Sequence, residues 1–504
     1  MTCTGFIADH TYRIEGGEPY VYLYGRLKNG KSFCTKHKYE PYFFIKEEDK
    51  DRVDEGEEEH SFRIEETDLK SFKGDDVVKV VTDVPGHVRD LRESFFDRDI
   101  ECYEADIRFS QRFLIDHRIN ITMEIDGDPD EGDRVDVFFL EPEIEDSEWQ
   151  PRPGDLDVLS IDIETSTDGD KLYCISLVSN DGMEKVIIAA DETFNKHTSV
   201  DNEMELLERF KEEVISYDPD VIVGWNVIDF DLDYLRDKFG EYDIDFSFGR
   251  TDDRISLRVY DDYMRDSKAD VPGRVVLDGI HVLKSSFIKL EDYKLSTASK
   301  EFLEEEKLLE DDEKGVMIDT YYEEDKEKLI EYNLKDSELV LNILDESGTL
   351  ALTILRSWLT GMTLDRVKAS IASIDSIYLK RLRSKGYVAV TTEYRRGGRS
   401  TTGGFVMDPK PGIYKSVIVM DFSSLYPSIM RTFNIDPLTY REDGEDCLEA
   451  PNGAMFSREK GLMPEILGEL YEERLKAKER DDDVTSGAIK ILMNSVYGVL
   501  ASPN

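Results

Sequence analysis

The chain has 504 residues, and its 111 acidic against 64 basic residues leave a formal net charge of −47 at neutral pH. This negative charge would repel nucleic acid if it were spread evenly, so composition alone argues against a DNA-binding protein. The sequence has no apolar run of about twenty residues and no signal-peptide pattern, which excludes a membrane-spanning protein and predicts a cytoplasmic one.

Two explanations of the charge stay open. Extreme acidity is typical of surfaces adapted to salt-rich cells, where screening shortens electrostatic repulsion and binding can rest on local basic patches. A few strongly acidic, solvated faces would produce the same total. The net charge therefore does not exclude a nucleic-acid partner.

The length predicts about three or four domains, and the patterns change along the chain. Residues 1–140 alternate apolar and polar side chains, as at 20–24 and 42–45, and predict a β-rich N-terminal domain. Within it, the acidic run 47–66 is expected to be a solvated loop. Residues 141–155 combine charge, proline and glycine before an apolar run, so we place a domain boundary there.

The patterns beyond this boundary predict first an α/β domain and then a mostly helical region. The first, residues 155–345, should contain a mixed sheet, with strands at 158–163, 173–178, 186–189 and 221–223 and a helix at 203–216. The helices expected in the second lie at 350–362, 368–384, 464–480 and 485–500. They surround one buried strand, 417–422. The fold class expected is multidomain, α/β and α+β.

Two carboxylates lie two positions apart in the first strand of the α/β domain. The strand period places Asp162 and Glu164 on one face, while Ile161 and Ile163 face a core. Two carboxylates placed in this way can share a metal ion. The spacing alone is weak support, because so acidic a chain should show it by chance about 25 times.

Two further segments place polar side chains where α/β sheets build their sites. Asn226 and Asp231 follow the apolar run 221–223, just past a predicted strand end. Tyr332 and Asp336 lie four residues apart in a helical pattern and therefore share one helix face. Taken separately, each acid is more often a solvated or helix-capping residue.

Together the three segments resemble the exonuclease motifs of family B DNA polymerases, which read DxE, Nx₃FD and Yx₃D in the same chain order. The resemblance implies an RNase H-like 3′–5′ exonuclease domain over residues 155–345. It also implies two Mg²⁺ ions, with Mn²⁺ as the alternative, held by Asp162, Glu164, Asp231 and Asp336. In the same way, Tyr332 would orient the attacking water, and Asn226 and Phe230 would contact the DNA strand end.

Residues 417–430, VIVMDFSSLYPSIM, resemble the family's first palm motif, DxxSLYPS. The apolar strand should end at Asp421, where the resemblance implies a carboxylate that bridges two catalytic metal ions. Tyr426 matches the family's steric gate, whose ring would clash with a ribose 2′-hydroxyl. A buried strand running into a turn would explain the apolar run, but not a match of this length.

The sequence KILMNSVYG at residues 490–498 resembles the family's fingers motif, Kx₃NSxYG. A helix aligns on one face the three residues that match the motif, Lys490, Asn494 and Tyr497. Arg474 and Lys478, four residues apart on the preceding predicted helix, match the family's other fingers helix. Three converging cations suit a triphosphate. Without Lys490, a solvated, salt-bridged helix face would explain the other pair.

The segment before the palm motif carries the clearest basic cluster, Arg395, Arg396 and Arg399. It is a candidate phosphate contact, and a solvated loop explains it equally well. The family's YxGG motif follows in altered form, with Thr401 where members usually have tyrosine. The chain therefore departs here from a contact thought to balance synthesis against editing.

The chain also lacks the family's second palm motif, YxDTDS, and its helical thumb. We therefore expect a partial palm over residues 346–463, fingers helices over 464–500, and a need for a C-terminal complement in synthesis. Three explanations stay open: a second chain completes a split polymerase, an intein or similar element interrupts the gene, or the sequence is a fragment.

The resemblance predicts template-directed DNA synthesis with 3′–5′ proofreading by two-metal-ion phosphoryl transfer, in an enzyme whose N-terminal domain resembles the archaeal type. The implied partners are primer–template DNA, deoxynucleoside triphosphates, a C-terminal polymerase fragment or second subunit, and a sliding clamp that binds through the missing part. No membrane partner is expected, and the location expected is the nucleoid. A stand-alone 3′–5′ exonuclease and an inactive, DNA-binding scaffold stay open as other functions.

Overall fold

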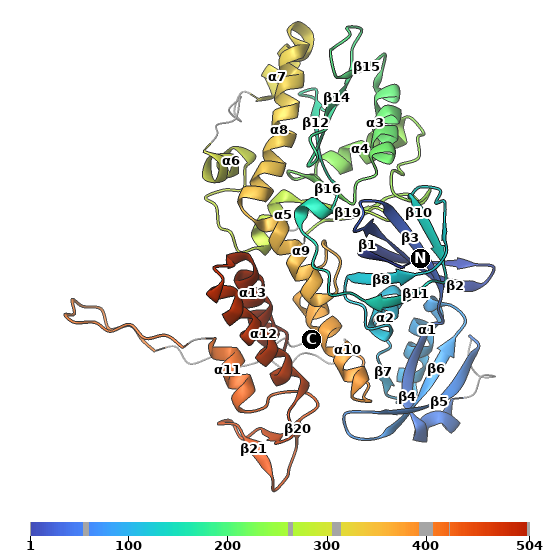
Figure 1. Ribbon diagram of the computed structural model, residues 1–504, viewed down its shortest axis with the longest axis vertical. Coiled ribbons are helices and arrows are strands. Elements are labelled where there is room, and N and C mark those ends of the chain that lie inside the picture. Colours follow the sequence, from blue (N-terminus) through green and yellow to red (C-terminus); the bar gives the residue numbers. More distant parts are fainter. Residues whose placement is uncertain are drawn as a thin grey trace. The chain divides into compact units, whose positions relative to one another are not determined.

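The computed structural model describes residues 2–53, 60–260, 266–304, 314–392, 407–422 and 424–500 (Figure 1). The chain divides into two compact units. One consists of Met1–Tyr39 and Ser110–Lys368, and the other of Glu40–Phe109 and Ala369–Asn504. Each unit is therefore built from two separate stretches of the sequence.

The first unit begins with a seven-stranded sheet, in the order β11-β8-β1-β2-β3-β10-β9. Its strands are β1 (Thr2–Glu15), β2 (Glu18–Leu27), β3 (Ser32–Lys38), β8 (Thr122–Asp126), β9 (Pro129–Asp130), β10 (Val137–Leu140) and β11 (Glu143–Asp146). The helix α2 (Phe109–Asp116) lies between β3 and β8 in sequence. The strand expected at 20–24 is confirmed as part of β2. The expected linker 141–155 contains β11 and a short 3₁₀ helix, Pro153–Asp155.

The second sheet of this unit has six strands in the order β15-β14-β13-β12-β16-β19. They are β12 (Val158–Thr165), β13 (Leu172–Ser179), β14 (Glu184–Ala189), β15 (Thr198–Val200), β16 (Val221–Gly224) and β19 (Val275–Asp278). The sheet is mixed, as expected, because β12 pairs with β13 antiparallel and with β16 parallel. A separate two-stranded sheet joins β17 (Ser256–Arg258) and β18 (Lys268–Asp270).

Helices cover both faces of the six-stranded sheet. The helices of this part of the chain are α3 (Glu203–Tyr217), α4 (Asp231–Glu241), α5 (Gly279–Ser285), α6 (Leu295–Leu303), α7 (Lys314–Glu324), α8 (Lys326–Glu346) and α9 (Thr349–Thr360). Of these, α3, α4, α5, α7 and α8 pack against the sheet, and α6 and α9 contact α8. On one face, Ile161 and Ile163 share a core with apolar residues of α3 and α4. On the other face, Cys174 and Ile188 pack with apolar residues of α7 and α8. The face of β12 opposite Ile161 and Ile163 is therefore the one that α8 covers.

The second unit contains a four-stranded sheet in the order β5-β6-β4-β7. Its elements are β4 (Tyr42–Lys46), the 3₁₀ helix η1 (Glu47–Arg52), β5 (Phe62–Lys70), β6 (Asp76–Thr82), α1 (Pro85–Asp97) and β7 (Cys102–Tyr103). The prediction of a solvated loop over 47–66 is wrong at both ends of this range, because η1 forms at its start and β5 at its end. Phe62 and Ile64 alternate with charged residues and pack into the core beside Phe95, which stabilises β5. Residues 54–59 lie outside the described part.

The C-terminal half of this unit is mostly helical. It comprises α10 (Ser370–Ser384), α11 (Leu425–Thr432), α12 (Leu462–Glu479) and α13 (Asp483–Leu500), with a small sheet of β20 (Tyr440–Arg441), β21 (Cys447–Glu449) and β22 (Met455–Ser457). All four helices expected after residue 345 are confirmed as α9, α10, α12 and α13. Among the described residues, no helix is both long and apolar enough to cross a membrane.

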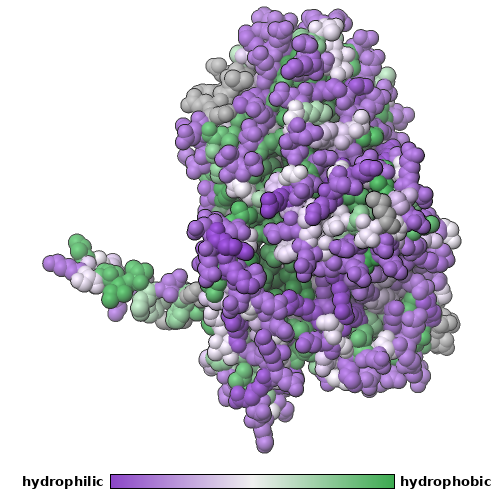
Figure 2. Space-filling view, viewed as in Figure 1, coloured by the Kyte–Doolittle hydropathy of each residue, from purple (hydrophilic) through white to green (hydrophobic). Residues whose placement is uncertain are grey.

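The expected buried strand 417–422 is not found. Val417, Ile418, Val419 and Met420 are 67–89% exposed, and the segment has no regular secondary structure. It is the extended orange segment in Figure 1, and its apolar residues are green in Figure 2. A strand needs a neighbour to accept and donate its ladder hydrogen bonds, and no strand in the described ranges pairs with these residues.

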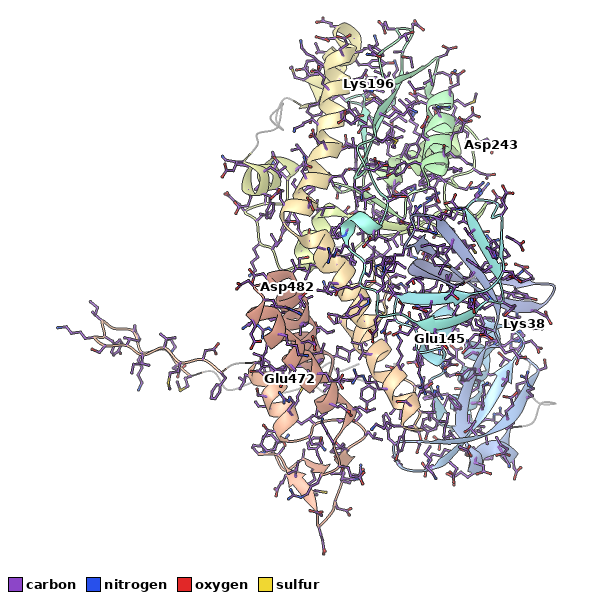
Figure 3. All side chains as sticks on the ribbon, in the orientation of Figure 1. Lys38, Glu145, Lys196, Asp243, Glu472 and Asp482 are labelled. Carbon is purple, nitrogen blue, oxygen red and sulfur yellow. The ribbon has the colours of Figure 1, made fainter. Side chains whose placement is uncertain are left out.

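Hydrophilic residues cover most of the face seen in Figure 2, as the composition requires. Acidic side chains such as Glu145, Asp243 and Glu472, which are labelled in Figure 3, are exposed. The acidic excess is therefore largely a property of solvated surface. The buried acids are few enough to be considered one by one.

Candidate functional site

The first part of the site is the face of β12 that carries Asp162 and Glu164. The alternation expected from the sequence is confirmed, because Ile161 and Ile163 lie in the core on the opposite face. Opposite the two acids, β13 presents Ser176 beside Asp162 and Cys174 beside Glu164. The acids therefore stand over a partly polar surface rather than over open solvent.

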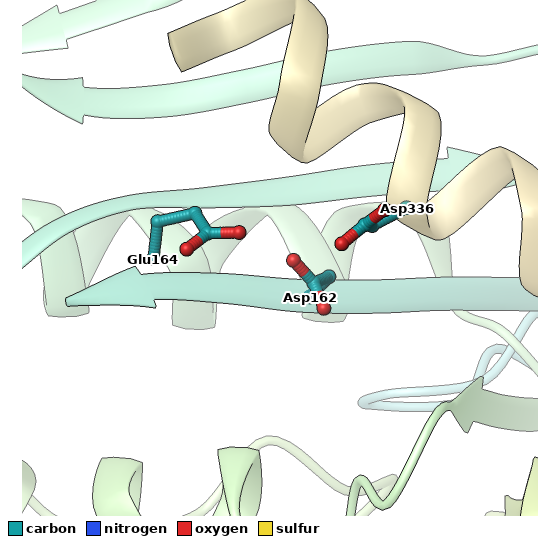
Figure 4. Close-up of side chains that lie close together, drawn as sticks. All are labelled: Asp162, Glu164 and Asp336. Atoms are coloured by element: carbon teal, nitrogen blue, oxygen red, sulfur yellow. The ribbon is translucent and has the colours of Figure 1, made fainter. Parts of the chain in front are cut away.

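The helix α8 crosses this face and brings a third carboxylate to the first two. Oxygen atoms of Asp162, Glu164 and Asp336 all lie within 4.8 Å of one another (Figure 4). Asp336 and Glu164 are buried, and Asp162 is half-buried. In the described residues this is the one group of three or more acidic, histidine or cysteine side chains close enough to share a metal ion.

The fourth predicted carboxylate, Asp231, lies beside this group but is not part of it. Asp231 is the first residue of α4, and its Oδ1 accepts a hydrogen bond of 3.1 Å from the backbone N–H of Ile163, between the two acids of β12. Burial, and then the negative charge of Asp162, raise the pKa of Asp231 well above its usual value. The structure thus holds three of the four predicted carboxylates together and the fourth within electrostatic reach.

The donor set fits a divalent cation. Carboxylate oxygens are hard, anionic ligands of the kind that Mg²⁺ and Mn²⁺ prefer. Three such groups within 4.8 Å repel one another when ionised, and a divalent ion would balance their charge. Asp162, Glu164 and Asp336 could therefore hold such an ion, with Asp231 adjacent.

The segment that connects β16 to α4 is packed tightly against β12. Gly224 ends β16 so close to β12 that an added Cβ atom would lie 2.8 Å from the carbonyl oxygen of Ile161. Asn226 follows in the left-handed conformation, with φ of 61°, and its carbonyl oxygen accepts the N–H of Phe230 at 3.1 Å. The Phe230 side chain is 47% exposed. The two predicted strand-end contacts thus lie in one turn directly before Asp231.

The residue predicted to orient the attacking water, Tyr332, lies on α8. Its side chain is 1% exposed and belongs to a hydrophobic cluster with Cys174, Ile188 and Leu329. Four residues later on α8, Asp336 faces the acids of β12. Tyr332 therefore packs α8 onto the sheet beside the site.

Sequence reasoning missed two buried polar residues at the site. Asn333, inside the Yx₃D segment, donates from Nδ2 to Oδ2 of Asp162 at 2.7 Å. Asp278 ends β19, and its Oδ1 accepts a hydrogen bond of 2.9 Å from the N–H of Ile280 at the start of α5. Its negative charge also raises the pKa of Asp231, although burial and the charge of Asp162 raise that pKa more. For Asp278 a signal existed, since the apolar run 275–277 ends in this acid, as the run 417–420 ends at Asp421.

The predicted nucleotide contacts lie on α11, α12 and α13 of the other unit. The rings of Tyr426 and Tyr497 stack with centroids 3.9 Å apart and an angle of 14° between their planes. Arg474 donates from Nη1 to Oγ of Ser424 at 3.3 Å. The remaining predicted contacts, Lys478, Lys490 and Asn494, are exposed. The stack brings the palm-motif tyrosine and the fingers-motif tyrosine together.

Asp421 is exposed and stands in the extended segment 407–422. Within the described ranges it belongs to no group of three potential metal ligands. The basic cluster of Arg395, Arg396 and Arg399, and Thr401 after it, lie outside the described residues. Among the residues that the structure describes, three potential metal ligands are therefore grouped around Asp162, and no such group of three contains Asp421.

Two family descriptions match the chain. "DNA polymerase family B, exonuclease domain" matches residues 100–298, which contain Asp162, Glu164 and Asp231. "DNA polymerase family B" matches residues 361–504, which contain Asp421. Asp336 lies between the two matched regions and reaches the site through α8.

Known proteins are similar over the whole chain. DNA polymerase II of Escherichia coli (strain K12) is 33% identical over 100% of this chain and 64% of its own length. A DNA polymerase of Archaeoglobus fulgidus is 28% identical over 98% of this chain and also 64% of its own length. The solved family B DNA polymerase of the hyperthermophilic archaeon Pyrobaculum calidifontis matches with a TM-score of 0.76 and 25% identity, over 99% of this chain and 68% of that one. This chain spans less than two thirds of the two sequence relatives.

Proposed function

The chain belongs to DNA polymerase family B, and on this premise we propose that it removes nucleotides from the 3′ end of DNA at the carboxylate site between β12 and α8. We propose further that α11, α12 and α13 supply the nucleotide-facing part of a template-directed DNA polymerase. The observation that carries the first proposal is the group of Asp162, Glu164 and Asp336, with oxygens within 4.8 Å of one another.

Asp162, Glu164, Asp336 and Asp231 would hold two Mg²⁺ ions, or Mn²⁺ in their place. When bound, such ions supply an activated water and stabilise the leaving 3′ oxygen of an in-line displacement at phosphorus. The chain's own residues orient the substrate: Asn226 and Phe230, in the turn before Asp231, would contact the last nucleotide. An exposed aromatic ring offers a stacking surface that accepts every base.

Synthesis is proposed as an activity of this chain together with a complement. Asp421 would be the first palm carboxylate, and Tyr426 with Tyr497 would line the sugar side of the nucleotide site. The residues proposed to contact the triphosphate and base are Arg474, Lys478, Lys490 and Asn494. In the described ranges Asp421 belongs to no group of three or more potential metal ligands, and we propose that its partner carboxylate comes from the complement. The partners proposed are therefore primer–template DNA, deoxynucleoside triphosphates, a C-terminal fragment or second subunit that supplies this carboxylate, and a sliding clamp that binds through that part, at the nucleoid.

The domain division that we propose follows these activities. Residues 1–140 form the β-rich N-terminal domain and residues 155–345 the exonuclease domain. Residues 346–463 form a partial palm, and residues 464–500 form the fingers helices. The compact units support a closer association of 40–109 with the palm segment than the sequence order suggests.

The test is an assay of a labelled primer annealed to a template, with Mg²⁺, that scores primer shortening and primer extension together. The full chain should shorten the primer, and the double variant Asp162→Ala, Glu164→Ala should lose this activity by at least about 100-fold, because it removes two of the grouped carboxylates. The matched control is Glu208→Ala, Glu212→Ala, which removes the same charge from exposed positions of α3 and should keep wild-type shortening.

Extension should appear only when a C-terminal palm fragment of a relative is added, and an Asp421→Ala variant should then abolish it. Shortening that a complement neither changes nor converts into extension would favour a stand-alone exonuclease. A chain that binds primed DNA but neither shortens nor extends it, alone or complemented, would overturn both proposals in favour of a scaffold.

A further inference from the structure

Asn333 is a buried amide that connects α8 to β12 at the carboxylate site. Its side chain is 0% exposed. Nδ2 lies 2.7 Å from Oδ2 of Asp162 and 3.2 Å from the Asp162 carbonyl oxygen. On the other side, Oδ1 lies 3.5 Å from Sγ of Cys174. All three hydrogen bonds of the amide therefore end on the two strands that form the base of the site.

The chemistry of these neighbours determines which way the amide faces. The Asp162 carboxylate and its carbonyl oxygen are both acceptors, so the two N–H groups of Asn333 must point toward them. The Cys174 thiol can donate, and the amide oxygen accepts from it. Turning the amide over would set oxygen against oxygen. Asn333 therefore has one satisfied orientation, which fixes where it donates.

A second hydrogen-bonded contact holds the backbone of Asn333 in place. Oγ of Ser176 donates to the Asn333 carbonyl oxygen at 3.0 Å, and it also lies 2.7 Å from Oγ of Ser337. Ser176 is the cross-strand neighbour of Asp162 on β13. The helix turn that carries Asn333 and Asp336 is thus anchored to the strand beside Asp162.

We propose that Asn333 is a positioning residue, whose amide holds the Asp162 carboxylate in the orientation in which it faces Glu164 and Asp336. An exposed aspartate samples several rotamers. A carboxylate that must be ordered each time an ion binds lowers the affinity of a metal site. With one oxygen held by Nδ2 and its backbone held by the same amide, Asp162 is preorganised before any ion binds. This inference rests on the proposed metal centre and adds a residue to it.

The experiment measures Mn²⁺ binding to the full chain by electron paramagnetic resonance of the free ion, apart from any nuclease activity. The part of the binding that is lost in Asp162→Ala defines the site, because the acidic surface binds Mn²⁺ weakly everywhere. Asn333→Leu keeps the side-chain size and removes the donor. It should weaken Mn²⁺ binding at the site by about 10-fold or more, as for other groups that orient metal ligands. Asn333→Ala, which adds no bulk, serves if Asn333→Leu does not fold.

Ser337→Ala is the matched control, because it removes a buried hydrogen bond between α8 and β13 without touching Asp162. It should lower the melting temperature and leave Mn²⁺ affinity at the site unchanged. Equal Mn²⁺ affinity in the wild type and both Asn333 variants would overturn the inference. If instead Asp162→Ala loses no Mn²⁺ at all, the proposed metal centre itself fails. Nuclease activity that is reduced in Asn333→Leu at low Mn²⁺ and restored at high Mn²⁺ would support both the positioning role of Asn333 and the proposed metal centre.

Discussion

His37 shows how burial changes the chemistry of a single residue in this chain. It lies in β3, is 5% exposed, and its Nε2 is 2.9 Å from Oγ1 of Thr35. Burial, and then the charge of His117, lower the pKa of His37 to about 3. The folded protein therefore keeps this imidazole neutral at a pH where an unfolded chain, with a histidine pKa of about 6.5, would protonate it.

The sign of the resulting pH dependence follows from proton binding. Between about pH 6.5 and pH 3 the unfolded state binds a proton that the folded state does not, so stability is lost as pH falls through this window. From about pH 7.5 to about pH 5.5 His37 should cost about 1.4 kcal/mol of the free energy of unfolding. Between the same two pH values, the free energy of unfolding of His37→Phe should fall by about 1.4 kcal/mol less than that of the wild type. Urea unfolding at each pH measures this difference. The exposed His117→Phe should keep most of the wild-type dependence, and equal slopes in the wild type and His37→Phe would contradict the prediction.

At the residue scale, spacing alone predicted which side chains share a face, whereas the family resemblance predicted that Asp336 joins Asp162 and Glu164. Asp162 and Glu164 are on one face because the strand period is two, a relation that only local geometry sets. Asn333 lies 171 positions from Asp162, and its hydrogen bond exists only because α8 packs on β13. Nothing within the Yx₃D pattern marks its second residue as a buried donor.

The elements that carry the site share a buried network of charges at their opposite ends. Asp157 precedes β12, Asp220 precedes β16 and Arg274 precedes β19, the three neighbouring parallel strands of the sheet. Arg26 of β2 contacts Asp220 at 2.8 Å and Asp157 at 2.9 Å. The network is completed by Arg250 with Asp218 and Asp220, and by Arg274 with Asp218. It joins the N-terminal sheet to the start of each site-bearing strand.

Removing one member of this network should be costly, because the remaining charges stay buried. Arg26→Met leaves Asp220, which is 0% exposed, with one partner fewer, and should lower the free energy of unfolding by about 3 kcal/mol. The control Arg254→Met breaks an exposed pair with Asp245 and should cost at most about 1 kcal/mol. Urea unfolding of both variants measures the difference. Equal costs would mean that the buried network does not hold the sheets together.

Element types were predicted best where the pattern is long and periodic. The helices α12 and α13 match their predicted ranges within a few residues, because each buries one apolar face against the other helices of the unit. The segment 417–422 carries an equally clear apolar pattern and forms no strand, since a strand depends on a pairing partner that its own residues cannot provide. For the acidic stretch around Phe62 the error was the opposite one: a loop was predicted, and the strand β5 forms because it pairs with β6.

At the scale of the whole molecule, the net charge of −47 should make stability depend on salt. Raising KCl from about 0.1 M to about 1 M shortens the Debye length from about 10 Å to about 3 Å, which screens repulsion between exposed acids. The melting temperature should rise by about 5 °C or more. An uncharged osmolyte at the same osmolality is the control. A melting temperature that falls or stays level in KCl would show that repulsion is already balanced by the exposed ion pairs.

By itself the sequence determined the family, the mixed α/β class, the helices α12 and α13, and the grouping of acids along β12. Each of these follows from spacing within a few residues or from a motif that can be recognised in the sequence. Only the tertiary structure decided that Asn333 reaches Asp162 and that Asp231 stays beside the group of Asp162, Glu164 and Asp336. It alone grouped residues 40–109 with the C-terminal helices. It alone left Asp421 in an exposed segment. The physical reason is that local periodicity is set by neighbours along the chain, whereas burial and ligand grouping are set by segments that return from far away in sequence.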